Sequence, residues 1–511
     1  MNLLKNKDFY ILLLPFCVFL LRLGGYPLFD VDEGAFSEAT RQMFERGDFI
    51  TPWLNGEPRF DKPVLIYWLQ AIGFMLFGAS EWAFRLPSAV AASLWAVLPY
   101  YFLRQRGQIE TARTAAVMIA TALGVFIIGR SATADALLNV LLVAALLDIY
   151  RYYETGRLSV LLRVFLWMGL GVLDKGPVAI LIPFVVSGLF FFTEGQWKTW
   201  LRAVFNPWGI ALLLLVAAPW YVVEYLREGM AFIDGFILRH NVERFSSTME
   251  QHGGSILYYL IVLPLLLLPY SSWFVRTMAN MRTGWGDPLQ RFLWIWFGFV
   301  LVFFSLSGTK LPHYVLYGIT PLLMLMAWRR RQISNWLHLL PGLLLLALMP
   351  LLPFLLASVH VHDAHVSALL SEPASVFVPG YMRLAVFFLA AGLLVALLPQ
   401  FSVWQRVIGL GLVQTLMLVL LLLPTAGRLQ QQPVVDAARF ARDHHLSVVM
   451  WRVNWPTFNV YSQQGTPRRD PVAGEVVLTM PQHLADLPAY QTLFAERGVV
   501  LARVESKAVA P

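Results

Sequence analysis

The sequence predicts an α-helical protein that crosses a membrane many times and carries a small α/β domain near its C-terminus. Of its 511 residues, 58% are hydrophobic and only 14% are charged, whereas a soluble globular chain carries nearer ~25% charged residues. Apolar runs of the length that a bilayer requires, roughly 20 residues, recur along the chain. Charged residues become frequent again only from about Pro433 onward.

The apolar runs predict about 13 membrane-spanning helices. Lipid offers no hydrogen-bond partner to the backbone, so these runs are expected to be helices rather than loops. The first run is longer than the apolar part of a signal peptide and lacks a small-residue cleavage site, which favours a retained helix. The clearest runs are Phe9–Leu28, Phe84–Leu103, Pro207–Tyr225, Ile256–Trp273, Leu337–Leu356 and Leu410–Pro424.

The distribution of lysine and arginine predicts the orientation in the membrane. Every second loop between apolar runs is basic, and such loops face the cytoplasm. The N-terminus is therefore expected inside, and the first loop (29–80) and the tail after Pro424 outside. The net charge of +8 is explained by these scattered loops, so no nucleic-acid partner is expected. The single Cys17 excludes an internal disulfide and a multi-cysteine metal site.

The first outer loop is too long and too patterned for a simple connector. Asp32–Arg46 has the spacing of an amphipathic helix, with Phe36 and Met43 on its apolar side. Pro63 opens a second short helix, Val64–Gly73, because proline is tolerated in the first turn. Both helices are expected to lie along the membrane surface.

The tail is predicted to form a separate small domain. Segments Ser447–Arg452 and Glu475–Met480 have the composition of strands between helical stretches. We therefore divide the chain into a membrane domain, residues 1–428, and a small α/β domain outside the membrane, residues 429–511.

Several carboxylates lie at the outer ends of predicted spans. Asp30, Asp32 and Glu33 follow the first span, and three acids so close to lipid require a cation, a proton or a positive partner. The alternative is a solvated helix start, where acidic residues favour the helix dipole. Asp135 lies at the outer end of the fourth span and is a functional candidate by its position. Asp174-Lys175, between two apolar runs, is interpreted as a turn.

Other polar residues on the outer side have two interpretations each. Arg59, Asp61 and Lys62 form either a helix cap with a surface pair, or a site where Lys62 binds a phosphate and Asp61 orients a sugar, base or metal. Lys310 is either a snorkelling anchor or a ligand. His240 is alone in its loop, which is typical of a structural histidine. His360, His362, Asp363 and His365 have metal-ligand spacing but no second cluster nearby.

The order of these motifs resembles a known family. The motifs are Asp32-Glu33-Gly34-Ala35-Phe36-Ser37-Glu38, Gly47-Asp48-Phe49, Arg59-Phe60-Asp61-Lys62-Pro63, Tyr67-Trp68, Asp135, His240-x-x-x-Arg244-Phe245 and Lys310-Leu311-Pro312-x-Tyr314. Together they resemble the polyprenyl-phosphate-sugar-dependent glycosyltransferases of the protein-mannosyltransferase superfamily, in particular the bacterial undecaprenyl-phosphate aminoarabinose transferases acting on lipid A. The resemblance covers about residues 8–425.

The resemblance implies a GT-C membrane fold and assigns roles to residues. Asp32 would be the central acidic residue of the site, with Asp135 and Glu33 as further catalytic candidates. Asp61 and His240 would share a divalent metal ion, such as zinc, magnesium or manganese. The family often has Tyr and Glu where this chain has Arg59 and Asp61, and the shorter carboxylate reaches less far. The candidates for binding the donor phosphate and sugar are Lys62, Arg59, Tyr314 and Lys310.

The resemblance also implies the activity. The expected reaction moves a sugar, such as 4-amino-4-deoxy-L-arabinose, from undecaprenyl phosphate to lipid A or another envelope acceptor, on the periplasmic face of a bacterial inner membrane. A hydroxyl acceptor would need Asp32 as base, whereas a phosphate acceptor would need it only to orient or stabilise. The protein is expected to act as a monomer. The alternatives are a lipid-linked sugar transporter or flippase, although transporters place ionisable groups near the midplane, and a non-catalytic envelope scaffold.

Overall fold

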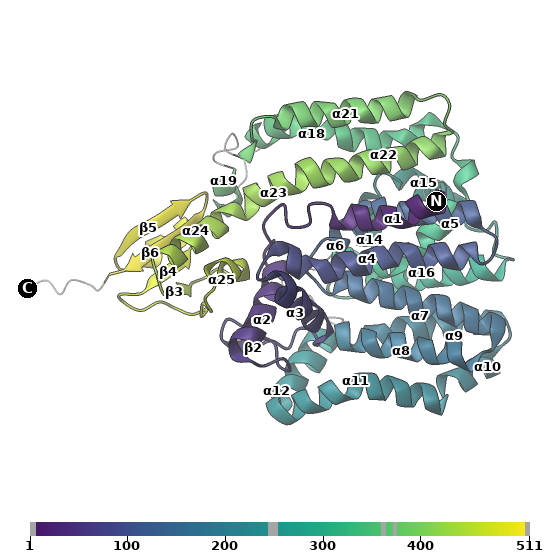
Figure 1. Ribbon diagram of the computed structural model, residues 1–511, viewed down its shortest axis with the longest axis horizontal. Coiled ribbons are helices and arrows are strands. Elements are labelled where there is room, and N and C mark those ends of the chain that lie inside the picture. The colour runs from purple at the N-terminus through teal and green to yellow at the C-terminus, as the bar shows by residue number, and fades with distance from the viewer. Residues whose placement is uncertain (1–6, 244–253, 359–363, 371–375, 506–511) are drawn as a thin grey trace, which may run out of the picture.

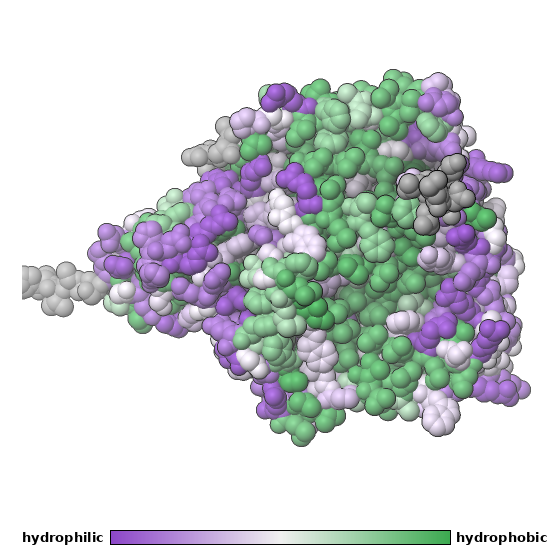
Figure 2. All heavy atoms as spheres, viewed as in Figure 1, coloured by the Kyte–Doolittle hydropathy of each residue, from purple (hydrophilic) through white to green (hydrophobic). Residues whose placement is uncertain are grey.

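The computed structural model describes residues 7–243, 254–358, 364–370 and 376–505, without the side chains of residues 240–242 and 364–366. Helices lie side by side in a bundle, and a small sheet with two helices projects from one end (Figure 1). A hydrophobic band crosses the visible face of the bundle, between hydrophilic residues at the projecting domain and at the opposite end (Figure 2). This distribution fits a bundle immersed in lipid between two aqueous layers.

The helices outside the C-terminal domain follow one another in a fixed order along the chain. They are α1 (Lys7–Leu20), α2 (Asp32–Arg46), α3 (Leu65–Phe77), α4 (Glu81–Arg104), α5 (Ile109–Thr121), α6 (Leu123–Gly129), α7 (Asp135–Thr155), α8 (Leu158–Lys175), α9 (Val178–Thr193), α10 (Trp197–Val204), α11 (Pro207–Glu228), α12 (Met230–Phe232), η2 (Ile233–Glu243), α14 (Tyr258–Leu266), α15 (Ser271–Ala279), α16 (Pro288–Leu306), η3 (Pro312–Gly318), α17 (Ile319–Trp328), η4 (Arg330–Gln332), η5 (Trp336–Leu339), α18 (Leu340–Ser358), α19 (Ala364–Leu369), α21 (Tyr381–Leu397), α22 (Val403–Met417), η6 (Leu418–Leu422) and α23 (Leu423–Gln430).

Six helical segments in the described part of the chain are long and apolar enough to cross a membrane. They are α4, α7, α11, α16, η5 with α18, and α22 continued through η6 and α23. The pair α5 and α6, bent by 62°, makes a seventh if it forms one broken span. The predicted number of about 13 spans, which counted shorter apolar runs too, stays a prediction.

Two predicted apolar runs are interrupted in the structure. The run Phe9–Leu28 is helical only as far as Leu20, because turns precede and include Gly24-Gly25. The run Ile256–Trp273 is divided into α14 and α15 near Pro269, which has no N–H to continue a helix. Apolar composition alone does not reveal such breaks.

The first outer loop contains the two expected helices, and α2 has the predicted bounds, Asp32–Arg46. Its surroundings differ from the prediction of a surface helix, because the residues from Glu33 to Met43 are all buried. It packs against α3 on one side and against the C-terminal domain on another. By contrast, α3 exposes Met75, Leu76 and Phe77, an apolar edge suited to lipid.

Between α2 and α3 a tight hairpin joins β1 (Trp53–Leu54) to β2 (Glu57–Pro58). Its turn is Asn55-Gly56, and both residues have positive φ, 54° and 89°. Asn-Gly is the pair that best tolerates this conformation, so the local sequence specifies the turn. The hairpin places Arg59 at its exit.

The C-terminal domain is an α/β sandwich built on one sheet. It consists of α24 (Gln432–Asp443), β3 (Val448–Met450), α25 (Pro456–Ser462), β4 (Val476–Thr479), η7 (Pro481–Asp486), β5 (Tyr490–Glu496) and β6 (Val499–Val504). The strand order is β3-β4-β6-β5, with β3 parallel to β4 and the other pairs antiparallel. Strands β3 and β4 lie within the two segments expected from the sequence, whereas β5 and β6 were not anticipated.

The C-terminal domain is joined to the bundle by hydrogen bonds from α25. Thr457 donates its backbone N–H to Asp30 Oδ1 (2.9 Å), and its hydroxyl donates to Asp30 Oδ2. The Tyr461 hydroxyl accepts from the N–H of Leu28 (2.9 Å) and donates to Glu81 (2.9 Å). A Cβ on Gly34 would lie 2.6 Å from the Thr457 nitrogen, so this close approach requires glycine.

Candidate active site

The acidic and basic site candidates gather at the end of the bundle that carries the C-terminal domain. Basic loops lie at the other end, where Arg106 pairs with Glu154 and Arg291 with Glu194. The loop before α2, the start of α7 and the end of α8 belong to the first end (Figure 1). Segments far apart in the sequence therefore contribute to one polar region.

Asp32 is the first residue of α2 and is exposed to solvent. Its carboxylate accepts no hydrogen bond from the described part of the chain, but it interacts electrostatically with Arg59. The positive end of the helix dipole favours a carboxylate there. Asp32 is therefore an accessible anion with unused acceptor capacity, as a base or orienting group requires.

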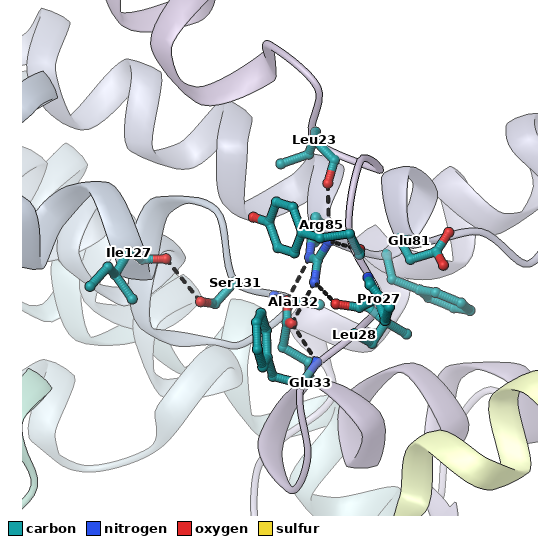
Figure 3. Close-up of polar contacts among 12 residues, drawn as sticks. Leu23, Pro27, Leu28, Glu33, Glu81, Arg85, Ile127, Ser131 and Ala132 are labelled. Atoms are coloured by element: carbon teal, nitrogen blue, oxygen red, sulfur yellow. Dashed lines mark hydrogen bonds and ion pairs between the residues drawn. The ribbon is translucent and has the colours of Figure 1, made fainter. Parts of the chain in front are cut away.

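Glu33, its neighbour, has the opposite environment. The residue is 4% exposed, and its carboxylate forms a two-point ion pair with Arg85, with Nε–Oε1 and Nη2–Oε2 distances of 2.8 and 2.7 Å. It also accepts the backbone N–H groups of Phe29 (2.8 Å) and Ala132 (2.7 Å). Figure 3 shows this convergence of Glu33, Arg85 and the surrounding backbone. Both carboxylate oxygens of Glu33 thus accept hydrogen bonds that join three segments of the chain. This role suits positioning rather than proton transfer.

Asp135, at the start of α7, is the centre of a second polar cluster. It is 6% exposed and is paired with Lys175 from the end of α8. The Tyr317 hydroxyl donates to Asp135 Oδ1 (3.0 Å), and His313 Nε2 lies 3.6 Å from the same oxygen. The interpretation of Asp174-Lys175 as a turn missed this contact, which spans 40 residues. Adjacent charges at the end of an apolar run were the available signal.

Asp174 is the least compensated carboxylate of the region. It is 0% exposed, and within the described residues neither of its oxygens has a hydrogen-bond partner. It interacts electrostatically with Lys62, Lys175 and Asp135. A buried acid without partners is costly, so a group that supplies donors or positive charge would be favoured beside it.

The predicted donor-binding residues lie in two places. Lys62 is half-buried, and its ammonium donates to the carbonyl of Asp61 (2.8 Å). Tyr314 is also half-buried, and its ring lies 6.0 Å from the Lys175 ammonium, which links it to the Asp135 cluster. Lys310 is 8% exposed and donates to the carbonyl of Ser307 (2.7 Å), so it does not extend toward the interface as a snorkelling anchor would.

The predicted metal site is only partly described. Asp61 accepts a hydrogen bond from Arg59 (3.1 Å), while the side chain of His240 and residues Arg244 and Phe245 lie outside the described residues. Within the described part, no group of three or more His, Cys, Asp or Glu side chains could hold a metal ion. His360, His362 and Asp363, and the side chain of His365, also lie outside it.

Comparison with known proteins finds relatives of part of the chain. Residues 61–222 match the family described as dolichyl-phosphate-mannose-protein mannosyltransferase. The undecaprenyl phosphate-alpha-4-amino-4-deoxy-L-arabinose arabinosyl transferase of Aeromonas hydrophila is 32% identical over 356 residues, 66% of this chain and 64% of that protein. The chain is similar to that protein over this part of its length. The protein of the same name in Yersinia enterocolitica is 32% identical over 349 residues, which make up 66% of this chain and 62% of that relative. The chain thus aligns with less than two thirds of each relative's length.

A solved structure has the same fold over nearly the whole chain. The crystal structure of ArnT from Cupriavidus metallidurans bound to undecaprenyl phosphate has a TM-score of 0.80 at 19% identity, covering 99% of this chain and 100% of that one. At this identity the likeness shows the fold alone. The GT-C fold implied by the sequence motifs is therefore confirmed, and the chain is a multi-pass membrane protein.

Proposed function

We propose that the protein is a glycosyltransferase that moves a sugar, 4-amino-4-deoxy-L-arabinose in the first instance, from undecaprenyl phosphate to lipid A or another envelope acceptor. The observation that carries the proposal is the exposed Asp32 carboxylate near the buried guanidinium of Arg59, whose hydrogen bonds are incomplete among the described residues. The names of the relatives support the choice of donor and sugar.

The proposed orientation places this site outside a bacterial inner membrane. About 13 spans would put the N-terminus in the cytoplasm and the C-terminal domain in the periplasm. The concentration of arginine-rich loops at the opposite end of the bundle supports this orientation, since basic loops stay on the cytoplasmic side.

In the proposed mechanism the polyprenyl phosphate is the leaving group and Lys62 stabilises its negative charge. Asp32 accepts the proton of a hydroxyl acceptor, or orients an acceptor phosphate that is already an anion. Asp135, held by Lys175 and Tyr317, keeps a fixed negative charge beside the developing oxocarbenium-like sugar. Glu33 positions the start of α2 through Arg85 rather than reacting. By resemblance, transfer inverts the anomeric centre.

A divalent metal held by Asp61 and His240 is a separate part of the proposal. Asp61 supplies the one described carboxylate of this pair, and it already forms an ion pair with Arg59. The roles given above to Asp32 and Lys62 do not depend on a metal.

The test is a transfer assay with the purified full-length protein. Wild-type protein, undecaprenyl-phosphate aminoarabinose and lipid A should yield an acceptor with a mass gain of one sugar. Asp32→Asn should reduce the rate by at least about 10²-fold, the scale expected for a lost acid–base group. Asp443→Asn, at an exposed carboxylate of the C-terminal domain, is the matched control and should keep the wild-type rate.

Two outcomes would overturn the proposal. Full activity of Asp32→Asn would remove Asp32 from the mechanism. Absence of any product, together with movement of the donor across proteoliposomes, would favour the flippase. The crowding of buried ionisable groups at one end of the bundle, rather than at its middle, argues for transfer over transport.

A further inference from the structure

A polar cavity lies where the bundle meets the C-terminal domain, separate from the Asp135 cluster. Its volume is about 440 Å³, and its wall includes the β1–β2 hairpin, η2 and loops of the C-terminal domain. Three arginines from these three segments line it: Arg59, Arg239 and Arg468. Of the four donor-binding candidates only Arg59 belongs to its lining, whereas Lys62, Tyr314 and Lys310 do not.

Arg59 is the buried member of this trio. It is 9% exposed, and its guanidinium lies 4.8 Å above the ring of Phe36. One nitrogen donates to Asp61 (3.1 Å), but Nε and Nη1 have no hydrogen-bond partner among the described residues. Buried guanidinium donors without acceptors are strongly unfavourable, so the site is incomplete until an acceptor group approaches or the side chain shifts toward one.

The other two arginines give the cavity a positive excess. Arg239 and Arg468 are exposed and form no ion pair with another described residue. Two carboxylates, Glu57 and Asp61, also line the cavity, and Asp61 is already paired with Arg59. Two guanidinium groups therefore remain against one free carboxylate, which favours an anionic ligand.

A second residue with an unpartnered atom indicates that the ligand also carries donors. The Oδ1 atom of Asn454 is buried and accepts no hydrogen bond from the described part of the chain, and Asn454 lines the same cavity. Guanidinium groups bind phosphoryl oxygens in two-point geometry, while an amide oxygen accepts from a hydroxyl or amide N–H. A sugar phosphate supplies both kinds of group.

We propose that Arg59, Arg239 and Arg468 form a subsite for a phosphoryl group of the acceptor glycolipid, with Asn454 contacting its sugar. The inference rests on the proposed function and extends it to acceptor recognition. The C-terminal domain contributes Arg468 and Asn454, so it takes part in selecting the acceptor. A phosphorylated lipid headgroup is the expected source of the anion, because the cavity lies at the end of the bundle that would face the headgroup layer of the membrane.

The first measurement is the acceptor dependence of transfer. Arg468→Gln and Arg239→Gln should each raise KM for a diphosphorylated lipid A by roughly tenfold, the loss expected for a charge-assisted contact. KM for the undecaprenyl-phosphate sugar should not change. Arg503→Gln removes an exposed arginine of the same domain outside the cavity and should match wild type.

The second measurement is binding of lipid A in nanodiscs to the Asp32→Asn variant, which does not depend on catalysis. Adding Arg468→Gln should weaken this binding about tenfold, and removing one lipid A phosphate should weaken it without further loss from Arg468→Gln. Equal KM and equal binding for Arg468→Gln and Arg503→Gln would overturn the subsite. If inorganic phosphate alone bound as tightly as the lipid and required Arg468, a free-phosphate site would replace it.

The two assays separate failure of the subsite from failure of the proposed function. Active protein with unchanged acceptor KM in the arginine variants would refute the subsite alone. Absence of transfer by wild-type protein, with lipid binding still dependent on Arg468, would refute the transferase and leave an anionic-lipid site.

Discussion

Two buried arginines at the first outer loop, Arg85 and Arg59, differ in how completely their nitrogens are hydrogen-bonded. Arg85 donates to both oxygens of Glu33 and to the carbonyls of Leu23, Tyr26 and Pro27, so all of its nitrogens are satisfied (Figure 3). Arg59 makes one hydrogen bond, to Asp61, and two of its nitrogens have no partner in the part of the chain that the structure describes. Both arginines are buried, yet Arg85 completes the fold whereas Arg59 lacks further acceptors there.

The physical reason lies in desolvation. Burying a charge costs several kcal/mol, and only complete hydrogen bonding offsets that cost. Around Arg85, backbone carbonyls of the loop after α1 supply the bonds that one carboxylate cannot. Arg59 instead follows the β1–β2 hairpin and lines a cavity.

The largest effect is expected from breaking the Arg85 region. Glu33→Gln leaves Arg85 buried without its counter-charge, and removing one partner of a buried pair costs about 3–5 kcal/mol. The free energy of unfolding in detergent, or the midpoint of thermal unfolding, should fall accordingly. The matched variant is Glu45→Gln on the same helix, whose carboxylate is exposed; if both lowered stability equally, the fold-completing role of Arg85 would be wrong.

A pH-dependent effect of intermediate size is expected from Asp30, in the loop that Arg85 holds. Burial raises the pKa of Asp30 from 3.8 to about 7, against the lowering effect of its bonds from Thr457. The folded state keeps this proton up to pH about 7, whereas the unfolded chain releases it above about 4, so stability falls as pH rises between these values.

Because Asp30 retains some solvent contact, we expect this loss to be roughly 2 kcal/mol rather than the full value of the shift. Thermal unfolding between pH 5 and 8 measures the slope. Asp30→Asn should flatten it, and Asp443→Asn should leave it unchanged. A wild-type slope that persists in Asp30→Asn would assign the effect to another group.

The smallest effect on stability is expected at Arg59. Arg59→Gln removes a buried charge that has one described bond, so unfolding free energy should change by no more than about 1 kcal/mol, in either direction. Arg85→Gln, the same substitution in the saturated region, is the direct comparison and should be far more destabilising. Similar losses for the two variants, measured by thermal unfolding, would show that Arg59 also supports the fold.

Local features of the sequence determined much of the architecture. Apolar composition identified the membrane domain, and 3.6-residue periodicity gave the bounds of α2 correctly. The order of motifs predicted the kind of protein to which this chain is similar. These properties depend on neighbouring residues alone, so they survive without knowledge of packing.

Only the tertiary structure decided what each charged residue does. Asp32 and Glu33 are adjacent acids in the sequence, yet one is exposed and the other is saturated by Arg85, 52 residues away. Lys175, which a local interpretation placed in a turn, is the partner of Asp135. Whether a buried charge is compensated depends on atoms brought together from distant segments, and this information is absent from the spacing of residues along the chain.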